Sequence, residues 1–551
     1  DEAALLRGLE QAYTRQFPWT TELRSKNAFP FGNRKFRKHQ EEIMNAALSG
    51  EDCFVLMPTG GGKSLCYQLL AIMSKGVTIV ISPLVSLMQD QVFNLTLKKI
   101  QSVCIDSSAQ WDDQLKAFRS MQGTASEEDR VSLIYITPEK FSKSDRFKAE
   151  MLSAHKNGLL QRVVIDEAHC LSEWGHDFRP DYKSLSRLKS LYPGLNIMAL
   201  TATATPRVKQ DIKHILQIPK ACVFWQSFNR ANLWYEVRKK GKGSKVVEDM
   251  ANFIRENNFQ KETGIIYCLS KKRCEDVANE LVDLGLKCKP YHAGLDSVVR
   301  NKTQMEWSND YVHVIVGTIA FGMGINKPDV RYVIHESMPK SMEGYYQESG
   351  RAGRDGKKAH CILFYSYGDK ATHDYMAQKD FEERSAKLSG QALVEATNQR
   401  ETQRENLNAM VAYCEDIFTC RRQGQLKYFG ETFNEAKCQS TCDNCRHKKV
   451  FEDRDVTDEA RSLVQIVEQL GGDKPLGTIV GVWRGSKAQR IVQYHRVEGY
   501  GRGQHLTLSE AERLLRQLIV EGYLAERIFT NPQYGGTCAH IEPGRLALAL
   551  M

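Results

Sequence analysis

The sequence predicts an α/β protein in which two parallel-sheet lobes are followed by a helical module and a winged-helix domain. Short, continuous apolar segments alternate with helical stretches from about residue 50 to about residue 370. Such segments are typical of strands that are buried on both faces of a parallel sheet and covered by helices. The alternation stops near residue 370, where a polar helical stretch and a cysteine cluster begin. Helical patterns and a hairpin signal in the last hundred residues predict the winged helix.

The individual elements follow from the same patterns. The strands predicted for the first lobe are residues 53–57, 77–81, 132–136, 163–166 and 197–201. Those predicted for the second lobe are residues 264–268, 312–317, 332–335 and 361–365. Residues 371–418 are polar, contain few Gly or Pro and are expected to be helical. Helices are also predicted over residues 459–470 and 509–521, before a hairpin with its turn at residues 530–536.

Length and composition set the class of protein. A chain of 551 residues is long enough for three or four domains, and 42% hydrophobic residues suit a globular protein with several cores. Apolar runs such as residues 77–81 are far shorter than the roughly 20 residues that span a bilayer, so no membrane partner is expected. The net charge of +9 is compatible with a polyanionic partner but is weak evidence alone. Because the chain begins with Asp1 and Glu2, without Met or a signal peptide, we expect a fragment of a longer protein.

A glycine-rich turn after the first strand predicts a nucleotide site. The stretch Met57-Pro58-Thr59-Gly60-Gly61-Gly62-Lys63-Ser64 lies between that strand and an apolar helix. Its backbone N–H groups can bind phosphate at a helix N-terminus. Lys63 would reach the β- and γ-phosphates of ATP, and the Ser64 hydroxyl would hold Mg²⁺. The alternative is a flexible turn without a ligand, which the strand before it and the Lys-Ser pair disfavour; Met57 replaces the first Gly of the usual pattern.

Two acids follow another predicted strand of the same sheet, in Asp166-Glu167-Ala168-His169. Asp166 would position Mg²⁺, and Glu167 would orient or deprotonate the attacking water. Adjacent acids after a strand are also common at helix N-termini. The presence of Lys63 in the same lobe favours the catalytic interpretation.

The second lobe contains two arginines three residues apart, in Gln347-Glu348-Ser349-Gly350-Arg351-Ala352-Gly353-Arg354. From one helical face, Arg351 and Arg354 can point into a cleft between the lobes, where they would stabilise negative charge on the γ-phosphate. Solvated or salt-bridged arginines are the alternative. The catalytic interpretation makes hydrolysis depend on closure of the two lobes, which is how a motor works.

Aromatic and basic residues lie just beyond the two acids. We predict DNA contacts for Trp174, His176, Phe178 and Arg179, in a segment whose rings would stack on bases and signal to the ATP site. A loop that packs into the core is the alternative. Arg230 and Asn232 are further candidates for contacts with DNA phosphates.

Four cysteines are spaced x17, x3 and x2, at Cys420, Cys438, Cys442 and Cys445. This spacing suits tetrahedral thiolate ligation of Zn²⁺, and four thiolates leave no open coordination position, so the zinc would be structural. Disulfides or chance clustering are the alternatives. The other cysteines are scattered, and a reducing compartment is expected for them because no secretory signal is present.

These residues together resemble the RecQ family of helicase superfamily 2. The superfamily is matched by Lys63-Ser64, Asp166 to His169, Thr201-Ala202-Thr203-Ala204 and Gln347 to Arg354. The marks specific to RecQ are Phe31-Gly32, Phe36-Arg37, Gln40, residues 172–179, residues 320–325 and the cysteine module. The phrase at residues 344–349 looks closest to the eukaryotic Bloom-syndrome helicase branch.

The resemblance implies roles for single residues and boundaries for the domains. Arg37 and Gln40 would recognise adenine, Arg354 would be the arginine finger, and Thr201 and Thr203 would link the nucleotide to the lobe interface. His169 and Gln347 would belong to the catalytic set. The implied domains are an N-terminal helical extension (1–24), two RecA-like lobes (25–226 and 227–370), a helical zinc-binding subdomain (371–450) and a winged helix (451–551).

The function implied is an ATP- and Mg²⁺-dependent 3′–5′ DNA helicase that acts on single-stranded and forked DNA in repair and recombination. The resemblance also implies a nuclear location and repair or recombination proteins as partners through flanking regions. The winged helix would contact duplex DNA, with Tyr534 at the tip of a strand-separating hairpin. Its candidates for phosphate contacts are Arg484, Lys487, Arg490 and Arg496, for which a solvated basic face is the alternative. An RNA helicase of the same superfamily, or a scaffold with a degenerate ATP site, are the alternatives; residues 174–179, the zinc module and the intact Lys63 argue against them.

Overall fold

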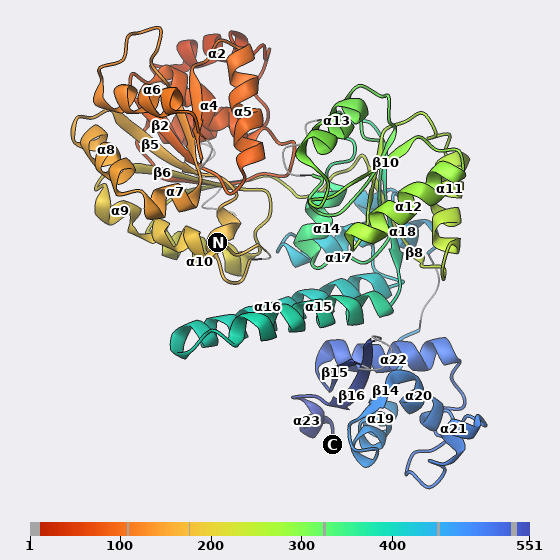
Figure 1. Cartoon of the computed structure of the whole chain (residues 1–551). Helices are drawn as coiled ribbons and strands as arrows, with labels where there is room; N and C mark the ends of the chain where they lie inside the picture. The colour runs from red at the N-terminus through yellow and green to blue at the C-terminus, as the bar shows by residue number, and fades with distance from the viewer. Residues whose placement is uncertain (1–11, 107–108, 176, 323–326, 449–451, 531–536) are drawn as a thin grey trace.

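The computed structural model describes residues 12–106, 109–175, 177–322, 327–448, 452–530 and 537–551. Figure 1 shows two sheet-containing lobes side by side, a long helical hairpin beneath them and a small domain at the C-terminal end. This arrangement confirms the predicted fold class. No helix among the residues described is both long and apolar enough to cross a membrane.

The first lobe is built on a seven-stranded sheet in which every pair of neighbours is parallel. Its strands, in spatial order, are β3 (Ser102–Ile105), β4 (Leu133–Ile136), β2 (Val77–Ile81), β5 (Leu160–Ile165), β6 (Asn196–Thr201), β1 (Cys53–Leu56) and β7 (Cys222–Trp225). The five central strands were predicted because they are apolar and almost wholly buried. The two edge strands were missed, because β3 begins with the polar Ser102 and β7 alternates between buried and more exposed residues.

Helices cover both faces of this sheet (Figure 1). They are α2 (Thr20–Ala28), α3 (Gln40–Leu48), α4 (Lys63–Met73), α5 (Val85–Leu97), α6 (Trp111–Gln122), α7 (Pro138–Lys143), α8 (Asp145–Lys156), α9 (Leu188–Leu191) and α10 (Pro206–Ile215), with short 3₁₀ turns η1 (Ala168–Leu171) and η2 (Pro180–Arg187). Two separate apolar clusters result, one on each face of the sheet.

The second lobe has a six-stranded parallel sheet. Its spatial order is β10 (Cys288–Tyr291), β11 (Val314–Gly317), β9 (Gly264–Tyr267), β12 (Tyr332–His335), β13 (Ala359–Tyr365) and β8 (Leu233–Lys239). The helices are α11 (Lys245–Glu256), α12 (Lys271–Asp283), α13 (Ser297–Ser308) and α14 (Met342–Ser349). The missed strands are again the edges: β10 contains Pro290, which is tolerated at an edge, and β8 carries charged residues.

The helical module begins with the antiparallel pair α15 (Gly368–Ser385) and α16 (Gly390–Glu415), which extends beneath the first lobe (Figure 1). An ion pair of 2.8 Å joins Lys183 of the first lobe to Glu395 of α16. The cysteine cluster follows in α17 (Arg421–Tyr428), η3 (Glu435–Cys438) and α18 (Asp443–Arg446). The module is tied to the second lobe, because the Val237 backbone N–H of β8 donates to Asp443 at 3.0 Å.

The C-terminal domain has its own apolar core. It contains α19 (Thr457–Gln469), α20 (Leu476–Trp483), α21 (Gln489–Val492), α22 (Leu508–Glu521) and α23 (Ala547–Leu550), with the antiparallel strands β14 (Lys474–Pro475), β15 (Leu524–Thr530) and β16 (Thr537–Pro543). Thr507 and Glu510 form a capping box that starts α22, and the predicted hairpin is the pair β15–β16. Helices followed by a hairpin are the predicted winged-helix pattern.

Candidate functional site

Three neighbouring strands of the first sheet end at one edge, and each leads into a predicted site segment. In the order β5, β6, β1, these strands run into Asp166, Thr201 and the glycine-rich turn of residues 57–62. The carboxyl ends of parallel strands form a crevice at which ligands bind in open α/β sheets. The sheet topology therefore brings together the glycine-rich turn and Asp166, which lie about a hundred residues apart in sequence.

The glycine-rich turn needs its glycines for space and for backbone conformation. Gly60 and Gly62 have φ angles of +82° and +89°, which favour residues without a side chain. A Cβ atom on Gly62 would lie 2.4 Å from the Gln40 amide nitrogen. Lys63 is the first residue of α4, and its ammonium group donates to the Met57 carbonyl at 3.0 Å. The ammonium group thus lies over the turn, at a helix N-terminus that favours an anion.

Lys63 and the two acids share one electrostatic environment. Removal from solvent lowers the pKa of Lys63, although Glu167 and Asp166 oppose this shift. Removal from solvent and the charge of Glu167 raise the pKa of Asp166. Two neighbouring acids that are removed from solvent and repel each other are suited to binding a cation, which would stabilise their charged forms. The Ser64 hydroxyl and the Asp166 carboxylate line the same cavity and are the oxygen donors that Mg²⁺ prefers.

A chain of hydrogen bonds leads from the acids to the second lobe. The His169 ring lies 3.3 Å from Glu167, and the same Nδ1 is 2.9 Å from the Thr201 hydroxyl. Thr201 in turn contacts Thr203, whose hydroxyl accepts from the Gln347 amide at 3.0 Å. This arrangement connects a candidate hydrolytic residue in one lobe to α14 in the other.

The arginine segment faces the glycine-rich turn across a cavity of about 630 Å³ that both lobes line. Gln347, Arg351 and Arg354 line it from the second lobe. The Arg354 side chain reaches to 3.6 Å from the place where a Gly60 Cβ would stand. Removal from solvent, with the charges of Arg351 and Arg230, lowers the pKa of Arg354 to about 10. It therefore stays cationic at neutral pH, where a phosphate would relieve the repulsion among the three arginines.

The two residues predicted to recognise adenine, Arg37 and Gln40, also line this cavity. The Gln40 amide donates to the Gly62 carbonyl at 3.0 Å, and the Arg37 guanidinium donates to the Gly60 carbonyl. The Arg37 backbone N–H also donates to the Gln40 side chain at 2.8 Å. Both side chains thus lie against the glycine-rich turn, next to the predicted phosphate site.

Arg230 and Asn232 have partners other than those predicted. The Arg230 guanidinium donates to the carbonyls of Gly350, Ala352 and Gly353 at 3.0–3.1 Å. The Asn232 amide donates to the Gly353 and Lys357 carbonyls. In the structure both side chains thus bind backbone carbonyls of the second lobe, and their contacts with DNA phosphates stay a prediction. These bonds support the arginine segment, a role that two isolated polar residues in a sequence do not reveal.

The aromatic segment, residues 172–179, lies between η1 and η2; His176 is outside the described residues. Trp174 and Phe178 are half-buried, so neither ring is wholly enclosed by the core. The Arg179 backbone N–H donates to the Cys170 carbonyl at 3.0 Å, and its guanidinium donates to the Pro83 carbonyl at 2.9 Å. Arg179 thus fastens the segment to the first lobe, next to the two acids.

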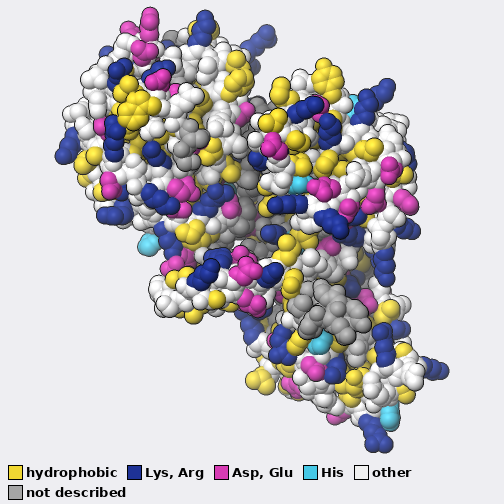
Figure 2. Space-filling model, in the orientation of Figure 1, with side chains coloured by type: hydrophobic (Ala, Val, Ile, Leu, Met, Phe, Trp, Pro, Cys, Tyr) yellow, Lys and Arg dark blue, Asp and Glu magenta, His cyan; other side chains and the backbone are white. Residues whose placement is uncertain are grey.

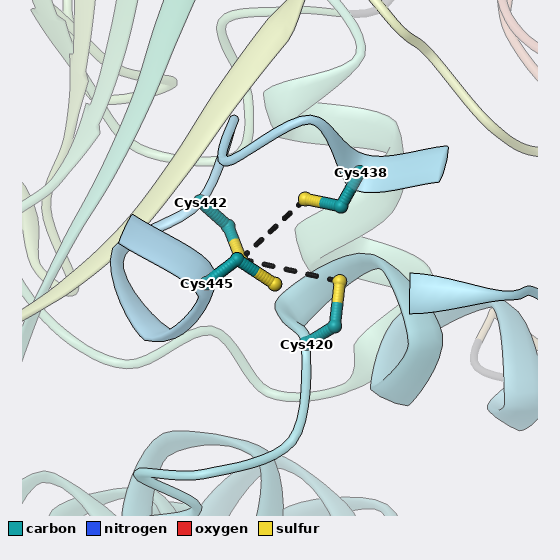
Figure 3. A group of neighbouring side chains, drawn as sticks. All are labelled: Cys420, Cys438, Cys442 and Cys445. Atoms are coloured by element: carbon teal, nitrogen blue, oxygen red, sulfur yellow. Dashed lines mark hydrogen bonds between the residues drawn. The ribbon is translucent and has the colours of Figure 1, made fainter. Parts of the chain in front are cut away.

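The four cysteines converge as the predicted zinc site requires. Figure 3 shows their sulfur atoms pointing toward one another, and all lie within 4.8 Å of one another. The Cys438–Cys442 and Cys442–Cys420 sulfur separations are 3.8 and 4.0 Å. A tetrahedron with Zn–S bonds of about 2.3 Å has sulfur separations of about 3.8 Å, so the residues fit zinc.

The C-terminal domain carries the remaining candidates. Tyr534 lies outside the described residues. Lys487, Arg490 and Arg496 are exposed, whereas Arg484 donates to the Leu506 carbonyl at 2.9 Å. Figure 2 shows basic side chains mixed with acidic ones over the visible face, so charge alone marks no DNA path there.

Four family models match consecutive parts of the chain. They are DEAD/DEAH box helicase (residues 37–212), helicase conserved C-terminal domain (245–356), RecQ zinc-binding (367–446) and RQC domain (450–540). The chain is 42% identical over 556 residues to RecQ-like DNA helicase BLM of Xenopus laevis. This match covers 97% of this chain and 39% of that protein. It is 40% identical over 546 residues to ATP-dependent DNA helicase Q-like 2 of Arabidopsis thaliana, covering 98% of this chain and 72% of that protein.

Among solved structures, the DUF1998 helicase MrfA bound to DNA has a similar fold, with a TM-score of 0.53 and 17% identity over 67% of this chain and 55% of that one. The chain spans less than half the length of several curated relatives that it matches.

Proposed function

The chain belongs to the RecQ family of helicases, and we propose that it is an ATP-dependent DNA helicase that translocates 3′ to 5′ on single-stranded DNA and unwinds forked duplexes. The observation that supports this most is the cavity between the lobes, where Lys63, Asp166 and Glu167 face Arg351 and Arg354. Nucleotide bound there would contact both lobes, so its hydrolysis would change how they are held together.

Each residue has a distinct task in the proposed reaction. Lys63 and the backbone of the glycine-rich turn would bind the β- and γ-phosphates, and Glu167 would orient the attacking water. Arg354 would stabilise the charge that develops on the transferred phosphoryl group. Mg²⁺, held by Ser64 and Asp166, would neutralise phosphate charge.

The link from hydrolysis to DNA would run through the segment that follows the acids. Gly175 lies close to the segment Asp166 to His169, because a Cβ atom on Gly175 would be 2.6 Å from the His169 carbonyl oxygen. A base stacked on Trp174 would therefore act on a segment in direct contact with His169, which itself lies 3.3 Å from Glu167. We propose DNA-stimulated ATP hydrolysis on this basis.

The wider role is part of the same proposal. By resemblance to eukaryotic relatives, we propose action in DNA repair and recombination in the nucleus, with protein partners bound through flanking regions. The exposed basic residues of the winged helix would contact the duplex ahead of the motor.

Forked substrates with a single-stranded tail of one polarity or the other test the proposal. With ATP and Mg²⁺, we expect strand separation of the DNA fork with a 3′ loading tail and little separation of the fork with only a 5′ tail. Matched RNA forks serve as the control. Equal unwinding of both DNA polarities would contradict the direction of movement, and a preference for RNA forks would instead support the RNA helicase alternative.

A further inference from the structure

Trp174 and Phe178, the aromatic residues of the segment 172–179 that the structure describes, each have a cationic side chain of the protein near the ring. The Arg207 guanidinium carbon lies 3.1 Å from the centre of the Trp174 ring, and the Lys183 ammonium lies 5.5 Å from that of Phe178. Cations over aromatic faces are held by the ring quadrupole, and arginine can also stack flat on tryptophan. The Trp174 face proposed to stack on a base is thus already in contact with a protein cation, whereas the Lys183 ammonium is paired with Glu173 and Glu395.

The position of Arg207 is the one that a nucleobase would need. At 3.1 Å from the ring centre, the guanidinium carbon occupies the space over the ring that a stacked base would take, and Trp174 packs elsewhere against the buried core of the first lobe. A base stacked on the same face would have to displace the guanidinium. Arg207 is itself exposed, so it can leave without disturbing the core.

The helix that carries Arg207 is also connected to the ATP site. α10 begins at Pro206, three residues after Thr203, which binds Gln347 across the lobe interface. One turn further along α10, Asp211 accepts a hydrogen bond from the Ser172 hydroxyl at 2.6 Å. α10 therefore holds the aromatic segment at two points, through Arg207 at Trp174 and through Asp211 at Ser172.

We propose that Arg207 is a placeholder for a nucleobase. In the absence of DNA, it stacks on Trp174 and holds the aromatic segment in a position that restrains ATP hydrolysis. A base of single-stranded DNA takes over the ring, and the released guanidinium binds a backbone phosphate of the same strand. Arg207 is thus a positioning residue that acts through Trp174. This inference rests on the proposed function of the segment as a DNA sensor.

The experiment measures ATP hydrolysis without DNA and with increasing single-stranded DNA, at several salt concentrations, for wild type, Arg207→Ala and Arg207→Lys. For Arg207→Ala, we expect the DNA-free rate of ATP hydrolysis to rise about two- to fivefold. This factor corresponds to the free energy of one exposed cation–π contact. The maximal DNA-stimulated rate should stay the same. The DNA concentration that gives half-maximal stimulation should depend less steeply on salt concentration, by the amount expected for the loss of about one phosphate contact. Arg207→Lys should fall between wild type and alanine, because lysine keeps the charge but not the flat stack.

Lys213→Ala on the same helix is the matched control, since it also removes one positive charge from α10. An unchanged DNA-free rate in Arg207→Ala, or an equal rise in Lys213→Ala, would overturn the placeholder role. Trp174→Ala separates the two proposals. If Trp174→Ala keeps full DNA stimulation, the segment is not the sensor; if it loses stimulation while Arg207→Ala behaves as wild type, only the placeholder inference fails.

Discussion

Replacing Arg354 by alanine is expected to slow ATP hydrolysis by about 10³- to 10⁵-fold, the range found for arginine fingers. The reason is geometric: Arg354 comes from the second lobe, yet its side chain lies next to Gly60 of the first. Its loss removes positive charge from the side of the cavity opposite Lys63. Steady-state kinetics should show the loss in kcat, with KM for ATP changed much less, since the charge is needed most in the transition state.

Arg384→Ala is the matched control for this variant. Arg384 is an exposed arginine on α15 that pairs with Asp380 at 3.3 Å and donates to Gln399 of α16 at 3.2 Å, far from the nucleotide cavity. The Arg384→Ala variant should hydrolyse ATP at the wild-type rate, and both variants should bind single-stranded DNA. If Arg354→Ala kept more than about a tenth of wild-type kcat, the cavity would not need charge from the second lobe, and closure of the lobes would lose its proposed role.

Replacing Cys442 by serine is expected to remove the zinc and unfold the module around it. Apparent binding free energies of structural zinc are about 10–16 kcal/mol near pH 7, and this energy supports folding directly. Cys442 is central to the cluster, because its sulfur contacts those of both Cys438 and Cys420. Elemental analysis should show about one zinc per chain in the wild type and almost none in the variant.

The effect should extend beyond the module, because α17 and α18 are tied to the second lobe. Arg422 donates to the Leu233 carbonyl of β8, and Asp443 accepts from the Val237 N–H. Limited proteolysis should therefore cut Cys442→Ser near residues 420–446 first. Cys538→Ser, which changes an exposed cysteine outside the cluster, should keep both the bound zinc and the wild-type resistance to proteolysis. Fully active protein without zinc would contradict the structural role.

Sequence patterns predicted the central strands better than the edges. Val77–Ile81 and Tyr332–His335 are continuous apolar runs between two other strands, and their bounds agree with the prediction. Strands at edges face solvent on one side, so β7, β8 and β10 mix exposed, charged or proline residues with apolar ones. The continuous apolar run that predicted the central strands is then absent, and little in the local sequence distinguishes these strands from loops.

The candidate site was predictable where one short segment carries the chemistry. Lys63 with Ser64, Asp166 with Glu167, and the cysteine cluster each have a spacing that few other structures require. Side chains that act through other residues carry no such mark. Arg230, Lys183 and Arg207 are single basic residues in ordinary surroundings, and only the fold places them against carbonyls, an acid pair and an aromatic ring.

The central claim is that nucleotide held between the lobes drives strand separation. It is tested most directly by fork unwinding in a single-turnover assay with Lys63→Ala, in the presence of saturating ATP and Mg²⁺. Loss of the ammonium group that lies over the glycine-rich turn should lower the rate of strand separation by about 100-fold or more, with DNA binding retained. Strand separation at the wild-type rate by Lys63→Ala would contradict the account.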